Sequence, residues 1–154
     1  MALSLAEKPV YARTINVGVG VLNAATAGAL GADTNGVTVY TAGSNGGRIE
    51  SLVANSDDTA AVNVFVYLKD GSSNIYPLGI VNVPASSGNS GTVASVDCLA
   101  GAGVTLRGML LDNTGKRYIS IPASWTLRVS CLANMTAAKK CHVTAQGFDF
   151  TSLA

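Results

Sequence analysis

The amino-acid sequence predicts an all-β protein, a single antiparallel β-sandwich of jelly-roll-like type with a short N-terminal arm. Apolar and polar residues alternate with a period of two along many short segments, as in strands with one buried face. Turn residues separate these segments at the spacing typical of sandwiches and barrels. No segment has the sustained three-and-four spacing of an amphipathic helix, so the helical crossovers that a parallel sheet needs are missing. The length of 154 residues suits one domain, and we expect the arm over residues 1–9 and the sandwich over residues 10–154.

The first half of the chain supplies most of the predicted strands. Its first segment, residues 14–32, carries no charge and could be mistaken for a signal peptide or a membrane span. Aliphatic residues there alternate with Asn and Gly, which favours a strand, and we expect no membrane association. Pro77 and Pro84 limit the last of these strands to an edge or a bulge. The predicted strands are 10–22, 37–41, 48–55, 62–69 and 75–83.

The second half is less regular. Residues 93–98 alternate, whereas residues 101–111 fit either a strand or an irregular crossover. Two well-marked strands, 125–131 and 141–146, end the domain.

Two of the three cysteines face each other if these last two strands form a hairpin. In that register Cys131 is opposite Cys141, and Trp125 is opposite Gly147, where the missing side chain leaves room for the indole. Directly opposed residues are close enough for a disulfide after a small adjustment. The alternative is a pair of buried thiols in a reduced cytoplasm. We expect Cys131 and Cys141 to be thiols during synthesis, and they could be oxidised to a disulfide in a particle released from the cell. Cys98 has no evident partner.

The composition argues for a structural part rather than an enzyme or a nucleic-acid binder. The net charge is +1, and only 12% of the residues are charged, against about 25% in an ordinary soluble domain. A nucleic-acid-binding protein usually carries a basic stripe instead. A weakly charged surface suits a protein packed against neighbours, because net charge promotes solubility. We therefore expect no enzyme activity, no cofactor and no nucleic-acid partner.

Each candidate for chemistry also has an ordinary structural interpretation. Asp57-Asp58-Thr59 and Asp112-Asn113-Thr114 could supply oxygen ligands to a cation, but they are equally typical of turns, and we expect no metal site. His142 follows Cys141 on a predicted strand, so the two side chains point to opposite faces and cannot form a thiolate–imidazole pair. The glycine clusters match neither a dinucleotide fingerprint nor a P-loop.

The C-terminal third resembles a family of small virion proteins of tailed bacteriophages. The family pattern "LD..G..Y..LPAG..L.V" is similar to residues 110–129, LLDNTGKRYISIPASWTLRV, with Ser124 where the pattern favours Gly. A threonine-centred turn (135–139, MTAAK) and the ending AQGFDF (145–150) follow as in that family. The cysteines are not part of the pattern. The resemblance implies a head decoration (cement) protein that forms a homotrimer at three-fold positions of the shell, binds the major capsid protein, and resides on the virion after assembly in the host cytoplasm.

The arm adds a candidate contact with that shell. Leu3 and Leu5 alternate ahead of Pro9, outside the first clear strand, and an extended apolar segment can dock on another chain by strand addition. Other interpretations stay open, namely a tail, collar or fibre component, or a carbohydrate-binding module. A sugar site usually needs exposed aromatic side chains, whereas we expect the single Trp to lie inside.

Overall fold

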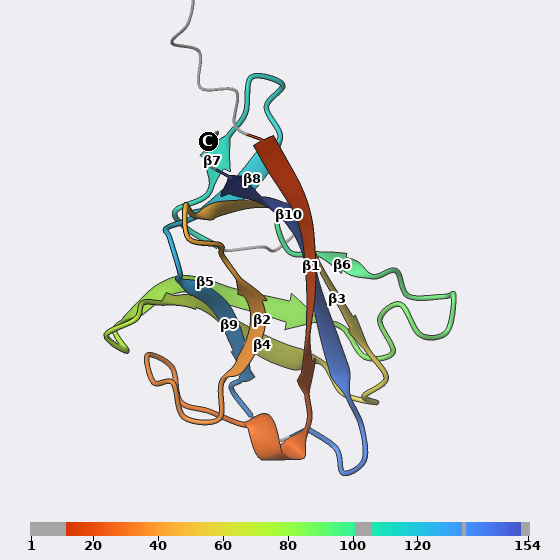
Figure 1. Ribbon diagram of the computed structural model, residues 1–154. Coiled ribbons are helices and arrows are strands. Elements are labelled where there is room, and N and C mark those ends of the chain that lie inside the picture. Colours follow the sequence, from red (N-terminus) through yellow and green to blue (C-terminus); the bar gives the residue numbers. More distant parts are fainter. Residues whose placement is uncertain (1–11, 101–105, 134, 152–154) are drawn as a thin grey trace, which may run out of the picture.

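The computed structural model describes residues 12–100, 106–133 and 135–151, which form two antiparallel sheets packed face to face (Figure 1). Within these residues there is no α-helix, and a short 3-10 turn, η2 (Ala24–Thr26), follows the first strand. The predicted all-β antiparallel sandwich is thus confirmed. The arm residues Leu3, Leu5 and Pro9 lie outside the described residues, so the predicted arm is untested.

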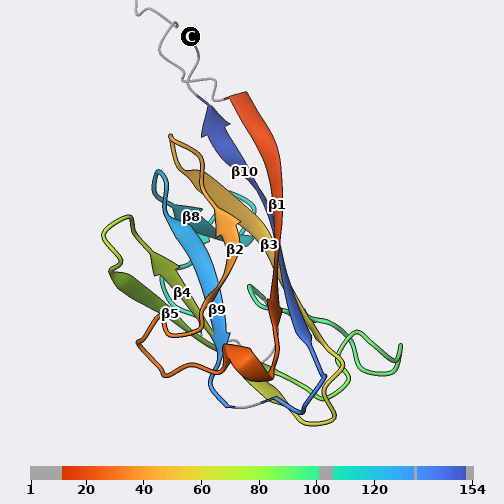
Figure 2. The same ribbon diagram turned by 60° about the horizontal axis from the view of Figure 1, so that its bottom comes forward.

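The strands divide into a larger and a smaller sheet. The larger sheet has the order β1 (Ala12–Leu22), β10 (Cys141–Thr151), β3 (Gly47–Ser56), β8 (Arg117–Ile121) and β7 (Leu110–Leu111), with β6 (Val96–Asp97) also beside β3. The smaller sheet has the order β2 (Val37–Thr41), β9 (Thr126–Cys131), β4 (Val62–Lys69) and β5 (Ile75–Val83). Figure 2 shows β1 and β10 side by side along one flank of the molecule.

The predicted hairpin of the last two strands is wrong. Strand β9 lies between β2 and β4, whereas β10 lies between β1 and β3 in the other sheet. Cys131 is therefore opposite Val64, and Cys141 is opposite Leu22. Each strand buries one apolar face, and because the two strands lie in opposite sheets, each does so from its own side of the shared core.

The expected contact between Trp125 and Gly147 is likewise absent. Trp125 is half-buried, and its ring stacks on that of Tyr76 with the centroids 4.6 Å apart. Gly147 lies at a bulge, where a Cβ would be 2.0 Å from the carbonyl oxygen of Arg48 in the neighbouring strand. The glycine thus permits a close approach between backbones and does not make room for an indole.

Aliphatic side chains from both sheets fill the interior. The largest of them, such as Ile49 and Leu52 from β3 and Leu127 from β9, are wholly buried. Strand β5 is the edge of the smaller sheet, and its register with β4 shifts just where Tyr67 meets Pro77. This confirms the expectation that proline would confine the strand to an edge or a bulge.

Candidate functional site

The most unusual surface of the molecule is the outward face of β1. Ile15, Val17 and Val19 are 76%, 56% and 52% exposed, although aliphatic residues in a strand normally face the core. We call these three side chains the β1 stripe. The residues between them, Asn16 and Gly18, face the opposite way, toward the interior.

Close packing against β2 explains why the usual arrangement is reversed. A Cβ on Gly18 would lie 1.8 Å from the carbonyl oxygen of Val39, and one on Gly20 would lie 2.8 Å from the side chain of the same valine. Only glycine fits this narrow space, so the aliphatic members of the alternation must point outward. The sequence analysis used the alternation as evidence for a strand, but it missed the exposed stripe. The signal that could have revealed the stripe is that glycines alternate with the aliphatic residues along this strand.

Strand β1 is also the edge of its sheet. Its one strand partner among the described residues is β10, and no charged residue occurs from Thr14 to Leu22. Soluble proteins commonly protect such edges with charged residues, proline, bulges or a covering element, because a long apolar edge invites association. An uncharged edge with three exposed aliphatic residues is therefore a candidate interface with another chain.

Aromatic and charged groups border one end of the β1 stripe. Phe148 lies opposite Ile15 in the register of β1 and β10, and the Arg13 guanidinium lies 4.4 Å from the centroid of its ring. In the next strand, the Arg48 guanidinium lies 3.8 Å from the Tyr118 ring centroid. Cations in such positions are attracted to the ring faces, which holds both arginines near the sheet and beside the stripe.

Ion pairs further neutralise this border. Arg48 pairs with Glu50 at 3.2 Å and with Asp112 at 3.4 Å. A shallow hollow lies next to the stripe, lined by Ile15, Glu50, Ser51, Lys116, Gln146, Gly147 and Phe148. The outer face of the larger sheet thus combines an apolar edge with a mixed and mostly paired set of charges.

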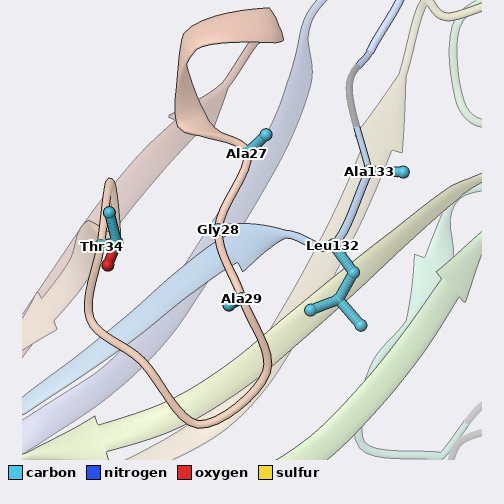
Figure 3. A pocket seen from close by; sticks show the side chains of 6 residues that line it. All are labelled: Ala27, Gly28, Ala29, Thr34, Leu132 and Ala133. Atoms are coloured by element: carbon cyan, nitrogen blue, oxygen red, sulfur yellow. The ribbon is translucent and has the colours of Figure 1, made fainter.

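A second depression lies at the other end of the molecule, between the loop after η2 and the end of β9 (Figure 3). Small side chains and Leu132 line it, and Thr34 supplies the one hydroxyl among them. A binding site for a small molecule usually has several convergent polar groups. This depression lacks them among its six lining residues, which are Ala27, Gly28, Ala29, Thr34, Leu132 and Ala133.

The aspartates considered as cation ligands are engaged in holding turns. Asp58 is buried and accepts hydrogen bonds from the backbone N–H of Thr136 at 2.9 Å and from its hydroxyl at 2.6 Å. Asp57 accepts one from the N–H of Lys140 at 2.6 Å. Asp112 accepts three from its own turn, two from Thr114 and one from the following lysine. Over the described parts of the chain, no group of three or more potential metal ligands comes together.

The three cysteines are thiols buried in the core. Burial raises the pKa of Cys98 and of Cys141 to about 12, with a further contribution from nearby acidic groups. His142 lies on the exposed face of β10 while Cys141 faces inward, as their adjacency on a strand predicted. A disulfide between Cys131 and Cys141 would have to cross between the sheets and would not join neighbouring strands, and its formation in a particle stays a prediction.

Comparisons with known proteins give a distant likeness among solved structures. No family model matches the chain, and no curated protein matches it. One similar solved structure is a chain of the capsid asymmetric unit of cyanophage Pam1, at 17% identity and a TM-score of 0.42, covering 96% of this chain and 98% of that chain. None of the helices in the described residues is long and apolar enough to span a membrane.

Proposed function

We propose that the protein is a structural component of a phage virion, namely a head decoration (cement) protein. It binds the lattice of the major capsid protein as a homotrimer at three-fold positions and stabilises the shell. The observation that carries the proposal of an assembled protein is the β1 stripe, an uncharged apolar edge of a kind that soluble monomers usually protect. The sequence resemblance, over roughly residues 105–150, supports a phage head as the assembly.

The mechanism is stabilisation by many contacts of modest strength. A trimer that contacts several capsid subunits at once binds far more tightly than one copy does, because every contact after the first is intramolecular. The low charge of the chain suits close packing on such a lattice. The N-terminal arm, with Leu3 and Leu5, would add a contact by reaching a neighbouring subunit. The proposal needs neither a catalytic step nor a cofactor, and it locates the protein on the capsid surface.

Co-sedimentation with empty shells of the parent phage tests this function. We expect the chain to sediment with the shells at a fixed ratio and to raise their melting temperature. Deletion of residues 1–9 should weaken that binding while the circular dichroism spectrum stays unchanged. A chain that ignores shells but binds purified tails would instead support a tail, collar or fibre component. Absence of binding to any virion part would refute the virion role.

A carbohydrate-binding module is the less favoured alternative. Such sites commonly present an open aromatic face to a sugar ring. Trp125 is stacked on Tyr76, and it also packs against the core. Each ring covers one face of the other, and although Tyr76 is 41% exposed, this stacked pair supports a sugar site less than the β1 stripe supports an assembly.

A further inference from the structure

We infer that the β1 stripe is the surface through which copies of this chain associate, with Ile15, Val17 and Val19 of one copy packed against the same residues of the others. This inference rests on the proposed homotrimer and names its contact surface. The occupant of the exposed face is thus a second copy and not the capsid protein.

The distribution of charge favours a copy of the same chain. A side chain near a symmetry axis meets its own counterpart, so a charged residue there would oppose an identical charge. The segment Thr14–Leu22 carries no charge, although charged residues begin at Arg13 on one side. That arginine is held over the ring of Phe148 at 4.4 Å, away from the middle of the stripe. A foreign partner would place no such restriction on β1, because a charge could then be matched by an opposite one.

The shape of β1 also suits contact between identical strands. The outward residues Ile15, Val17, Val19 and Val21 are all β-branched and recur at every second position. They form a continuous apolar ladder, so copies of the strand arranged around a three-fold axis can bring equivalent side chains together. The glycines on the inner face fix β1 against Val39, so the stripe is presented by a rigid strand.

The stripe is exposed at the place where β1 of each of the three copies would meet. Exposure falls from 76% at Ile15 to 52% at Val19, so all three side chains have area left to bury. Association at this face would leave the far sheet, β2-β9-β4-β5, free to contact other chains. It would also bury the apolar face that a monomer would otherwise present to solvent.

Light scattering on the purified full-length chain and two variants tests the inference. We expect a trimer for the natural chain and a monomer for Val17→Lys, with the dissociation constant raised at least about 100-fold by like charges at the contact. Because position 17 is exposed, the variant should keep its circular dichroism spectrum, and its melting temperature should no longer depend on protein concentration. Val17→Thr combined with Val19→Thr keeps β-branching and should weaken the trimer more mildly. Leu30→Gln is the matched control, since Leu30 is 62% exposed but lies in a loop outside the stripe, and it should stay trimeric.

A mixture of variants tests whether the stripe meets itself. Val17→Lys and Val17→Glu chains should each be monomeric alone, and mixing should restore part of the association, because a trimer of both variants has two contacts between opposite charges and one between like charges. A natural chain that is monomeric at all concentrations, or a Val17→Lys chain that stays trimeric, would overturn the inference.

Shell binding measured on the same samples separates the two proposals. A Val17→Lys trimer that no longer sediments with shells would show that the stripe contacts the capsid, which overturns the inference and leaves the proposed function standing. A natural trimer that Val17→Lys dissociates, but that never binds shells, would support the inference and refute the proposed function.

Discussion

Gly18 of β1 lies directly against the carbonyl group of Val39 in β2, so closely that a Cβ on this glycine would be 1.8 Å from the oxygen. The two strands belong to different sheets, and this contact joins the sheets at one corner of the sandwich. It also decides which way the rest of β1 faces. The exposed stripe on the outside and the glycines on the inside are two results of the same packing.

Replacement of Gly18 by alanine should therefore destabilise the fold by about 2 kcal/mol or more, because the new Cβ would overlap the backbone oxygen of Val39, which cannot rotate away. Urea unfolding followed by circular dichroism measures the loss. Gly71→Ala is the control, since a Cβ there meets nothing within 4 Å, and its effect should be near zero or slightly favourable. Equal stability of the Gly18→Ala and Gly71→Ala chains would contradict the packing described here.

Asp58 should be needed for the turn that leads into β10. Its two carboxylate oxygens accept hydrogen bonds from the N–H and the hydroxyl of Thr136, and the N–H of Ala60 donates another. In Asp58→Asn an amide NH₂ would face one of these donors, which should cost about 1–3 kcal/mol in the free energy of unfolding. Asp97→Asn is a control at an exposed aspartate, and it should cost less. An Asp58→Asn variant with unchanged stability would show that the turn is held by other contacts.

Some of this architecture follows from local sequence. The strands 37–41, 62–69 and 75–83 have the bounds that alternation and flanking turn residues predict. Each is short, rich in β-branched residues and bounded by Gly, Asn, Asp or Pro, so the evidence lies within the segment itself. Strand β8, residues 117–121, was not predicted, because only its middle and end are apolar.

The errors concern relations between segments. Residues 126–131 and 141–151 have the same alternation whether they pair with each other or lie in opposite sheets, so the false hairpin could not be recognised locally. Residues 15–19 show two alternating sets, and the set with the smaller aliphatic content, Asn16 and Gly18, faces inward because Gly18 lies against Val39, which is distant in the sequence. The candidate site arises from that contact, so alternation alone could not reveal it.

Stability should fall at acidic pH through Asp33. Burial acts to raise the pKa of Asp33, but hydrogen bonds from Lys69 and Tyr67, together with the charge of Arg128, outweigh it and lower the pKa below the usual value. Lys69 Nζ and the Tyr67 hydroxyl each lie 2.5 Å from the carboxylate, and Arg128 Nε lies 3.1 Å away. Because the folded pKa is the lower one, this stabilisation is complete above the unfolded pKa of about 3.9 and is lost as the pH falls through the folded value.

Thermal unfolding between pH 7 and pH 2.5 checks this dependence. The natural chain should lose stability below about pH 4, where the unfolded state binds more protons than the folded state. Asp33→Asn should be less stable at pH 7 and should lose less on acidification. An equal loss in both chains would assign the acid sensitivity to other carboxylates such as Asp58, whose pKa is lowered chiefly by its hydrogen bond from the Thr136 hydroxyl.

The cysteines should be unreactive in the folded protein. Cys98, Cys131 and Cys141 are buried, and burial raises the pKa of Cys98 and Cys141 to about 12, so almost no reactive thiolate is present at pH 8. A chromogenic thiol reagent at pH 8 should therefore find no rapidly reacting thiol among these three until urea unfolds the chain, and then all three should react. Intact mass under non-reducing conditions should equal that of the fully reduced chain. A mass lower by the two hydrogens lost in one disulfide would instead show that two of the cysteines are joined. Loss of that bond in Cys131→Ser and in Cys141→Ser, but not in Cys98→Ser, would identify it as a bond between Cys131 and Cys141.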